Sequence, residues 1–540
     1  MDGSTMPGPA AGGAGGGPTL RLSGRRFTAA MGLTETYTTN ALGITNGIGI
    51  ANAGGGNYSG GDFITRLTLS LGAHDHTARF DGDLEYTLAG DAYARHPSYD
   101  GVYNYLNALG TATLIPERLV VRGSAFAAPI LINGLGAIGA GNRPVAAGAN
   151  SGIRDTYGYT ISPDLMFRLG NFARSETTLN QSSIFFVQPG GASLSQTIPG
   201  STAPTELISY GASERLSSGI DFNRLNWALT AFAIKQTQSG ADLSQATIRG
   251  DFRYAVSREV VFFTDLGYQS ITSKQGLSQS VSGPSAFGGI QYTPSPNFEA
   301  DASAGSQFNS PSYVGNLRYQ FAAFTSLSAS VTDTVSTPAG RLIGGLGQLG
   351  ANAQGNFFNT NFQLNPTTPP GTVSGISAFN PAPPDGAAIT PTIFRYRSAY
   401  VTLLHIADRT QYRLTAYRTV YDTLSTVPLG ITLPGGSISV PVTIRSRGTS
   451  TGADLEISRN MTPHLTGSLD ANYSVQDALG GQYRLFGVSL NFSYLMTPQM
   501  QTFLNAAYLH RDSNAALVAV SPFSGSLSDA SIMIGISRQF

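Results

Sequence analysis

The chain has 540 residues with a formal net charge of +0, and charged residues make up only 12% of it. This is too little charge for an ordinary soluble surface, while 10% aromatic residues are too many for a disordered chain. The neutral charge excludes a basic nucleic-acid-binding surface, and the absence of cysteine excludes disulfides, zinc–thiolate sites and cysteine nucleophiles.

The first 25 residues are rich in Gly, Pro and Ala, and we expect them to be a flexible periplasmic segment. They lack the charged, apolar and small-residue regions of a signal peptide. We therefore expect that the sequence is a processed form or begins at the wrong start codon.

The clearest strands lie between residues 63 and 88. Leu67, Leu69 and Leu71 alternate with polar residues, a turn is expected at 72–76, and residues 78–88 then alternate between apolar and charged side chains. Such alternation is typical of strands with one apolar and one polar face. Similar runs cover 106–125, 246–259, 465–473 and 486–508.

Mean hydropathy is −0.03, and no run reaches the roughly 18 apolar residues that a membrane-spanning helix needs. A transmembrane β-barrel fits, because only alternate wall residues face lipid. We predict a single antiparallel up-and-down barrel over residues 26–540, with about 22 strands and a range of about 18 to 24. The strands are expected at 26–38, 63–73, 77–89, 102–115, 118–129, 154–163, 172–187, 205–217, 224–237, 245–257, 259–271, 284–294, 298–308, 313–323, 326–335, 391–406, 411–424, 443–458, 464–476, 482–495, 500–512 and 526–540.

The connections fall into two lengths. Brief Pro-containing turns are expected at 161–164, 293–297 and 461–464, and longer Gly/Pro/Ser/Asn loops separate them. Short turns belong on the periplasmic side of an outer-membrane barrel and long loops outside. Residues 336–390 form the longest connection, which we interpret as an extracellular loop or, alternatively, a segment folded into the lumen.

The inward positions of these strands are mostly small and polar, but some are charged. The charges form either rings that select solutes or a mutually neutralised, hydrated interior. The predicted lumen-lining residues are Arg66, Arg79, Asp81, Asp83, Glu85, Arg122, Arg249, Asp251, Arg253, Asp265, Glu299, Asp301, Arg318, Arg413, Asp454, Glu456, Asp470 and Arg484. Because both signs occur, the lining suits neutral or mixed-charge solutes such as saccharides.

Several aromatic residues and histidines allow other interpretations. Tyr93, Tyr99, Tyr103, Tyr105 and Phe126 fit stacking on sugar rings, but an aromatic girdle at the membrane boundary is favoured. The His74-Asp75-His76 run is expected to be a solvated turn, because no third metal ligand is evident.

No enzymatic activity, cofactor or metal is predicted. The remaining histidines have no motif context with a nucleophile. Gly345, Gly347 and Gly350 match a nucleotide-binding pattern only loosely, and no βαβ unit surrounds them.

The closing segment Ser531-Ile532-Met533-Ile534-Gly535-Ile536-Ser537-Arg538-Gln539-Phe540 alternates strictly and ends in Phe. A terminal Phe on such a strand resembles the signal read by the barrel-insertion machinery of Gram-negative outer membranes. We therefore predict an outer-membrane location, with Phe540 as the insertion signal and membrane lipid and lipopolysaccharide as neighbours.

The segment Leu33-Thr34-Glu35-Thr36-Tyr37-Thr38-Thr39-Asn40, the run from Asp62 to Leu71, and residues 104–121 resemble two overlapping families. These are the β-barrel porin 2 proteins and the outer-membrane barrels associated with PEP-CTERM and exopolysaccharide loci. The chain has Thr39-Asn40 where the families show Asp-Asn, and Leu69-Ser70-Leu71-Gly72 where they show Pro-Gly. The resemblance implies passage of polysaccharide or other small hydrophilic solutes, and it supplies no catalytic residue.

These observations favour a porin-like channel for hydrophilic solutes, with exopolysaccharide export as one form. The alternative is a non-conducting structural or interaction barrel that binds a protein partner through its loops. A TonB-dependent transporter also has about 22 strands, but it needs a large N-terminal plug, for which residues 1–25 are too short.

Overall fold

The computed structural model describes the wall of a barrel. The described residues are 20–22, 25–40, 61–97, 100–131, 153–187, 206–238, 241–275, 277–336, 393–424, 447–478, 481–513 and 526–540. The predictions for residues 1–19 and for almost all of 336–390 lie outside these ranges.

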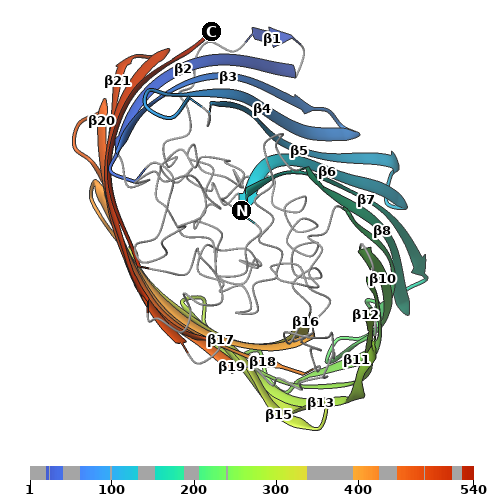
Figure 1. The fold of residues 1–540 in the computed structure, drawn as a ribbon. Helices are drawn as coiled ribbons and strands as arrows, with labels where there is room; N and C mark the ends of the chain where they lie inside the picture. The colour runs from blue at the N-terminus through green and yellow to red at the C-terminus, as the bar shows by residue number, and fades with distance from the viewer. Residues whose placement is uncertain are drawn as a thin grey trace, which may run out of the picture.

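Twenty-three antiparallel strands form one sheet, which curves into a closed ring (Figure 1). They are β1 Leu20–Leu22, β2 Arg25–Thr38, β3 Asp62–His76, β4 Phe80–Tyr93, β5 Gly101–Ile115, β6 Leu119–Leu131, β7 Ile153–Leu169, β8 Ala173–Val187, β9 Glu206–Ser218, β10 Leu225–Gln238, β11 Ala241–Ala255, β12 Val260–Gln275, β13 Leu277–Ser295, β14 Phe298–Gln307, β15 Ser310–Ala322, β16 Thr325–Ser336, β17 Phe394–Ala407, β18 Thr410–Thr423, β19 Arg447–Asn460, β20 Leu465–Ala478, β21 Gly481–Thr497, β22 Met500–Ser513 and β23 Leu527–Gln539.

The last long strand closes on the first. β23 pairs with β2 from Ala30↔Gln539 to Thr38↔Ser531, whereas β1 pairs only with the start of β2 and stands outside the ring. The wall is therefore a closed barrel of 22 strands, β2 to β23. Each strand expected from the sequence is present, so the predicted fold class is confirmed.

Two turns were predicted in the wrong place. Residues 161–164 lie inside β7 and residues 72–76 inside β3. Proline has no N–H to donate to a ladder. β7 tolerates Pro163 because Ser162 and Pro163 have no pairing partner in β8. The real turns follow at 170–172 and 77–79.

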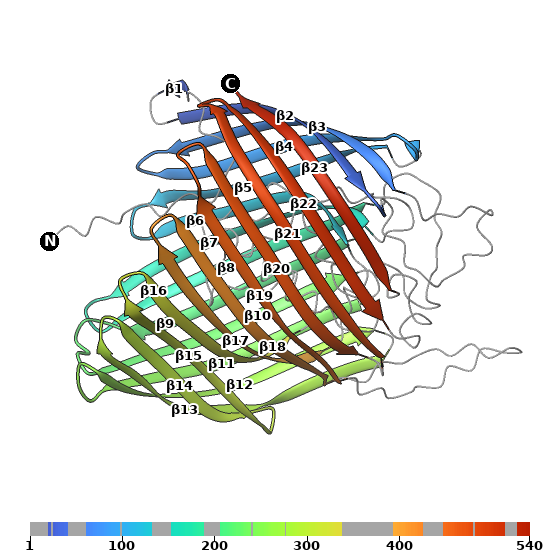
Figure 2. The ribbon, with the colours of Figure 1, turned by 90° about the vertical axis from the view of Figure 1, so that its left-hand side faces the viewer.

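Short turns mark one end of the barrel, which also holds the C-terminus (Figure 2). They join the strands at 77–79, 116–118, 170–172, 219–224, 256–259, 296–297, 323–324, 408–409, 461–464 and 498–499. Short turns define the periplasmic end of such barrels, so the opposite end is extracellular.

The outer face is apolar and bounded by aromatic rings. Near the extracellular ends the exposed rings include Tyr37, Phe63, Tyr157, Tyr210, Tyr313, Tyr473 and Tyr508; near the periplasmic ends they include Phe80, Phe167, Tyr254, Tyr292, Phe324, Tyr412, Tyr494 and Phe540. Two aromatic girdles on a closed barrel are the signature of the outer membrane of Gram-negative bacteria, where this chain resides. Within the described residues, no helix is long and apolar enough to cross a bilayer.

Candidate functional site

The face opposite the apolar one lines the lumen. Because the sheet is concave on this side, inner side chains reach across a whole strand. Gln307 of β14, for example, donates to Gln269 of β12 at 2.9 Å across β13. The cross-strand pairing assigns the same face to all the predicted lumen-lining residues except two.

Arg79 and Arg484 are the two exceptions. Arg79 lies in the exposed periplasmic turn before β4. Arg484 of β21 shares a face with Phe486, whose ring is exposed on the lipid side. Both predictions of a lumen position were wrong.

The inner charges are concentrated in the periplasmic half of the barrel. Apart from Arg66, every inward residue that was predicted lies within six residues of the periplasmic end of its strand. The two furthest from that end are Arg249, six residues before Ala255, and Asp454, six residues before Asn460. We call this set the charged belt. It comprises Asp81, Asp83, Glu85, Arg122, Arg249, Asp251, Arg253, Asp265, Glu299, Asp301, Arg318, Arg413, Asp454, Glu456 and Asp470, together with Asp164, Arg168, Arg174, Glu176 and Arg215, which the sequence reasoning missed.

One acidic arc of the belt lies on β3 and β4. Asp81, Asp83 and Glu85 occupy successive inward positions on β4. His74 of β3 bonds to Asp83, and His76 Nδ1 lies 3.2 Å from Asp81 Oδ1. His74-Asp75-His76 is thus the end of a strand, not a turn. The described residues include no group of three or more ligands placed to hold a metal.

A second acidic arc lies on β18, β19 and β20. Glu456 pairs with Arg413 on one side and stands directly opposite Asp470 on the other. Asp470 accepts hydrogen bonds from Ser489 at 3.4 Å and Asn491 at 3.3 Å. Asp454 lies on the same face, so three carboxylates share one arginine. The arc therefore presents net negative charge to the lumen.

The basic arc lies on β6 to β9. Arg122 Nε donates to Asp164 at 2.6 Å, and Thr178 donates to the other oxygen of that carboxylate at 2.6 Å. Beyond this pair, the strands carry three arginines and one carboxylate: Arg215 stands opposite Glu176 in the ladder, and Arg168 also lies 3.5 Å from Glu117 of the neighbouring periplasmic turn. The remaining two, Arg168 and Arg174, are paired in register on β7 and β8.

The arc between these has four carboxylates and three arginines, so it is close to neutral. Arg249 pairs with Asp265, and Arg253 Nε donates to Asp251 at 3.0 Å. On β14 and β15, Glu299 stands opposite Arg318, and Asp301 accepts from Asn316 at 3.1 Å. Figure 1 places β7 and β8 across the lumen from β19 and β20, so the basic and an acidic arc face each other.

The extracellular half of the inner face carries a neutralised ion pair and buried aromatic residues in place of the charged belt. Arg66 is neutralised there by a two-bond ion pair with buried Asp91, at 2.5 and 2.6 Å. Tyr93, Tyr103 and Tyr105 are inward and buried, as is Phe126, so the interpretation of these tyrosines as a lipid-boundary girdle was wrong. Tyr99 lies outside the described residues.

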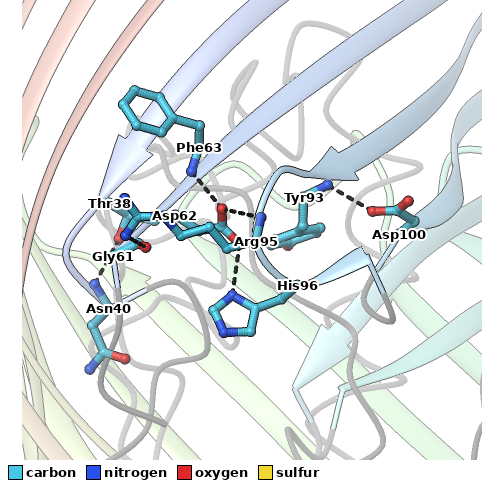
Figure 3. Close-up of polar contacts among 9 residues, drawn as sticks. All are labelled: Thr38, Asn40, Gly61, Asp62, Phe63, Tyr93, Arg95, His96 and Asp100. Atoms are coloured by element: carbon cyan, nitrogen blue, oxygen red, sulfur yellow. Dashed lines mark hydrogen bonds and ion pairs between the residues drawn. The ribbon is translucent and has the colours of Figure 1, made fainter. Parts of the chain in front are cut away.

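At the extracellular rim, Asp62 organises the start of β3 (Figure 3). Its buried carboxylate accepts from the N–H groups of Phe63 and Arg95 at 2.8 and 2.9 Å and contacts His96 Nδ1 at 2.8 Å. Asp100 likewise accepts from the N–H of Tyr93 at 2.7 Å. These bonds satisfy backbone groups where the ladder ends, which is a structural role.

The comparisons with known proteins concern the barrel. No family model matches the chain, and no curated protein matches it. Among solved structures, the iron transporter FrpB from Neisseria meningitidis (F3-3 variant) is 8% identical, with 95% of this chain and 81% of that chain covered at a TM-score of 0.48. The alcaligin outer-membrane receptor FauA from Bordetella pertussis is 11% identical, with 97% of this chain and 77% of that chain covered at a TM-score of 0.37. The siderophore receptor PirA from Pseudomonas aeruginosa is 8% identical, with 95% and 80% covered at 0.37. The resemblance to the porin and exopolysaccharide-associated families stays a prediction.

Proposed function

We propose that the protein is an outer-membrane channel for small hydrophilic solutes, and that the charged belt is its selectivity filter. The observation that carries this proposal is the belt itself. A barrel of 22 strands encloses a bore wider than its own side chains fill. Charges on the lumen side of such a bore contact whatever passes through it.

The composition of the belt defines the solutes. Carboxylates outnumber arginines among the described belt residues, and the histidines are only a partial counterweight. Cations are therefore preferred to anions. The separation of the acidic arcs from the basic arc favours solutes that carry both charges or a large dipole, because such solutes align with the transverse field. Export of an exopolysaccharide is a narrower version of this proposal, and it rests on the family resemblance alone.

Conductance in planar lipid bilayers tests the channel. Purified barrels whose folding is verified by heat-modifiable electrophoretic mobility should give stable current steps with a reversal potential that indicates cation preference. Liposome swelling with saccharides of graded size then measures which neutral solutes pass. Folded barrels that carry no current, even after deletion of residues 337–392, would reject the channel.

A second candidate is the non-conducting structural or interaction barrel. It is favoured by the inner face of the extracellular half, where Ile64, Ile184 and Leu207 are fully buried and therefore unavailable to solutes. The same conductance experiment separates the two candidates, because a structural or interaction barrel carries no current.

A further inference from the structure

The barrel wall has a step on its extracellular side. Pairing between β15 and β16 stops at Gly315↔Val331, although β15 continues to Ser310 and β16 to Ser336. On the other flank, β13 extends to Leu277, far beyond Gln307, the last residue of β14. Between β13 and β16 the short β14–β15 hairpin therefore leaves a notch that no backbone ladder of the described strands crosses.

The depth of the notch follows from the length of β14. Ten residues tilted by about 40° rise roughly 25 Å, which is only the height of the apolar band of an outer-membrane barrel. The hairpin turn at Phe308 and Asn309 thus lies at the boundary between the acyl chains and the head groups of the outer leaflet. Because the β15–β16 ladder already stops at Gly315↔Val331, the lower part of the gap lies below this turn and faces the acyl chains.

Side chains close the notch in place of backbone hydrogen bonds. We call them the notch cluster: Leu243, Ile271, Val281, Phe308, Val335 and Ile393. Leu243 and Ile271 are inward residues of β11 and β12, whereas Val335 is on the β16 face that points to lipid lower in the strand. The end of β16 therefore lies inside the line of the wall, as Figure 1 shows, and packs against strands that are not its neighbours.

The turn beneath the cluster is unfavourable by itself. Phe308 has φ 51° and Asn309 has φ 58°. Two positive φ angles suit a tight hairpin turn, but a bulky aromatic residue rarely adopts one. The ring of Phe308 packs against the notch cluster, which compensates for the backbone conformation. Strain of this kind is retained where the surroundings require a particular conformation.

A polar latch completes the closure. Arg395 Nη2 of β17 donates to the carbonyl oxygen of Pro311 on β15 at 2.7 Å, and the same guanidinium binds Asp333 of β16. Pro311 has no N–H for a ladder, so β15 is held here by a side chain from two strands away. Beside it, the hydroxyl of Ser312 is buried and has no hydrogen-bond partner within the part of the chain that the structure describes. This contact is made by side chains alone, so opening it breaks no hydrogen bond of the β15–β16 backbone ladder.

Cationic side chains lie on the lipid side of the latch. Arg397 is half exposed, 3.9 Å from Asp333 and 3.4 Å from Asp422, and Arg447 is more exposed, 3.6 Å from Asp422. Arg418 is exposed on the same face. Together with Arg395, four arginines here face two carboxylates. The surplus suits an anionic group at head-group depth, beside the apolar notch cluster.

We propose that the notch is a lateral portal through which a single-chain anionic amphiphile passes between the outer leaflet and the lumen, with Arg395 and Asp333 as its latch. The head group is received by Arg397 and Arg447, and the chain passes through the notch cluster as the β16 end swings away from β13. This route is separate from the passage of hydrophilic solutes along the barrel axis.

Contact quenching of tryptophan by 9,10-dibromostearate in lipid nanodiscs tests the portal. The chain has one Trp, so Trp227→Phe gives a silent background. Asn316→Trp then places a reporter on the inner face at the base of the notch, and Leu317→Trp places one on the outer face. Because the chain has no cysteine, Val281→Cys with Val335→Cys places the only two thiols in the notch cluster, and the variant is used once its oxidation to a single disulfide that locks the notch is verified by mass spectrometry.

We expect the inner reporter to be quenched, the disulfide to lower that quenching several-fold, and reduction to restore it, while the outer reporter is quenched throughout. An inner reporter that is never quenched, or that is quenched equally with the notch locked, overturns the proposal. A second measurement does not depend on the disulfide: Arg397→Gln with Arg447→Gln should weaken quenching by dibromostearate but not by the uncharged dibromo-octadecanol. Equal weakening for both probes contradicts the assigned role of the arginines.

Discussion

Arg395 and Asp333 are diagonal neighbours on β17 and β16 whose charges meet in a two-bond ion pair, at 2.8 and 2.6 Å, with each side chain only 3% exposed. The pair is thus enclosed by protein where the neighbouring ladder has ended. Asp333→Asn leaves the guanidinium buried without its counter-charge, and we expect a loss of about 3–5 kcal/mol in unfolding free energy. Urea unfolding in detergent micelles, followed by tryptophan fluorescence, measures the loss.

A matched control for this pair is available at the periplasmic end. Arg168 and Glu117 lie 3.5 Å apart, but each side chain is 75% exposed. Glu117→Gln should therefore cost less than about 1 kcal/mol. The double replacement Asp333→Leu with Arg395→Met should recover much of the stability lost in Asp333→Asn, because it removes both buried charges. A double variant less stable than the single one would show that the pair is a net source of stability.

Variants of the acidic arc and of the basic arc should change the ion selectivity of the channel in opposite directions. Asp454→Asn with Asp470→Asn removes charge from an acidic arc, and we expect the permeability ratio of K⁺ to Cl⁻ to fall by about two-fold or more. Arg174→Gln with Arg215→Gln should raise it. The reversal potential in a KCl gradient measures both. Arg484→Gln on the lipid face is the control and should leave the ratio unchanged; if all three variants behave alike, the belt does not select ions.

Much of the barrel could be predicted from local sequence because a strand with one face in lipid has a strict period of two. On β4 the positions of Leu84 and Leu88 fix those of Asp83 and Glu85. Arg484 was open to the same reasoning, since it is in phase with outward Phe486. Arg79 was misplaced because the alternation continues unchanged through the turn that precedes β4.

The remaining features depend on relationships between distant residues. Sequence reasoning misses Asp164 and Arg168 because Pro163 indicates a turn, and only pairing with β6 and β8 shows that the strand continues. The notch depends on where the β15–β16 ladder stops, and the alternation of apolar and polar residues does not show this. Pro311 is a local hint, because proline within a sheet favours an edge.

A glycine in β14 tests how tightly the wall is packed. A Cβ at Gly305 would overlap the carbonyl oxygen of Ala286 on β13, which is backbone and cannot rotate away. We expect Gly305→Ala to cost about 1–3 kcal/mol of unfolding free energy by overpacking. At Gly288 a Cβ meets nothing within 4 Å, so Gly288→Ala is the matched control and should be close to neutral. Equal urea midpoints for the two variants would contradict the register between β13 and β14.

Phe540 is predicted to act during assembly more than in the finished barrel. Its N–H donates to the carbonyl of Ala29 at 2.7 Å, which any residue would do. Its ring is 54% exposed on the outer face, and the guanidinium of Arg538 lies 5.1 Å from the ring centroid. Phe540→Ala should therefore change the stability of the folded barrel by less than about 1 kcal/mol, as exposed substitutions usually do.

In cells, however, we predict that the ring is the signal for insertion, so the same variant should reduce the amount of heat-modifiable, folded barrel in the outer-membrane fraction several-fold. Gln539→Ala, on the inner face of the same strand, is the control and should assemble normally. The two measurements must differ for the prediction to hold. If unfolding free energy falls as steeply as the assembled fraction, Phe540 acts through stability, and its role as a recognition signal is wrong.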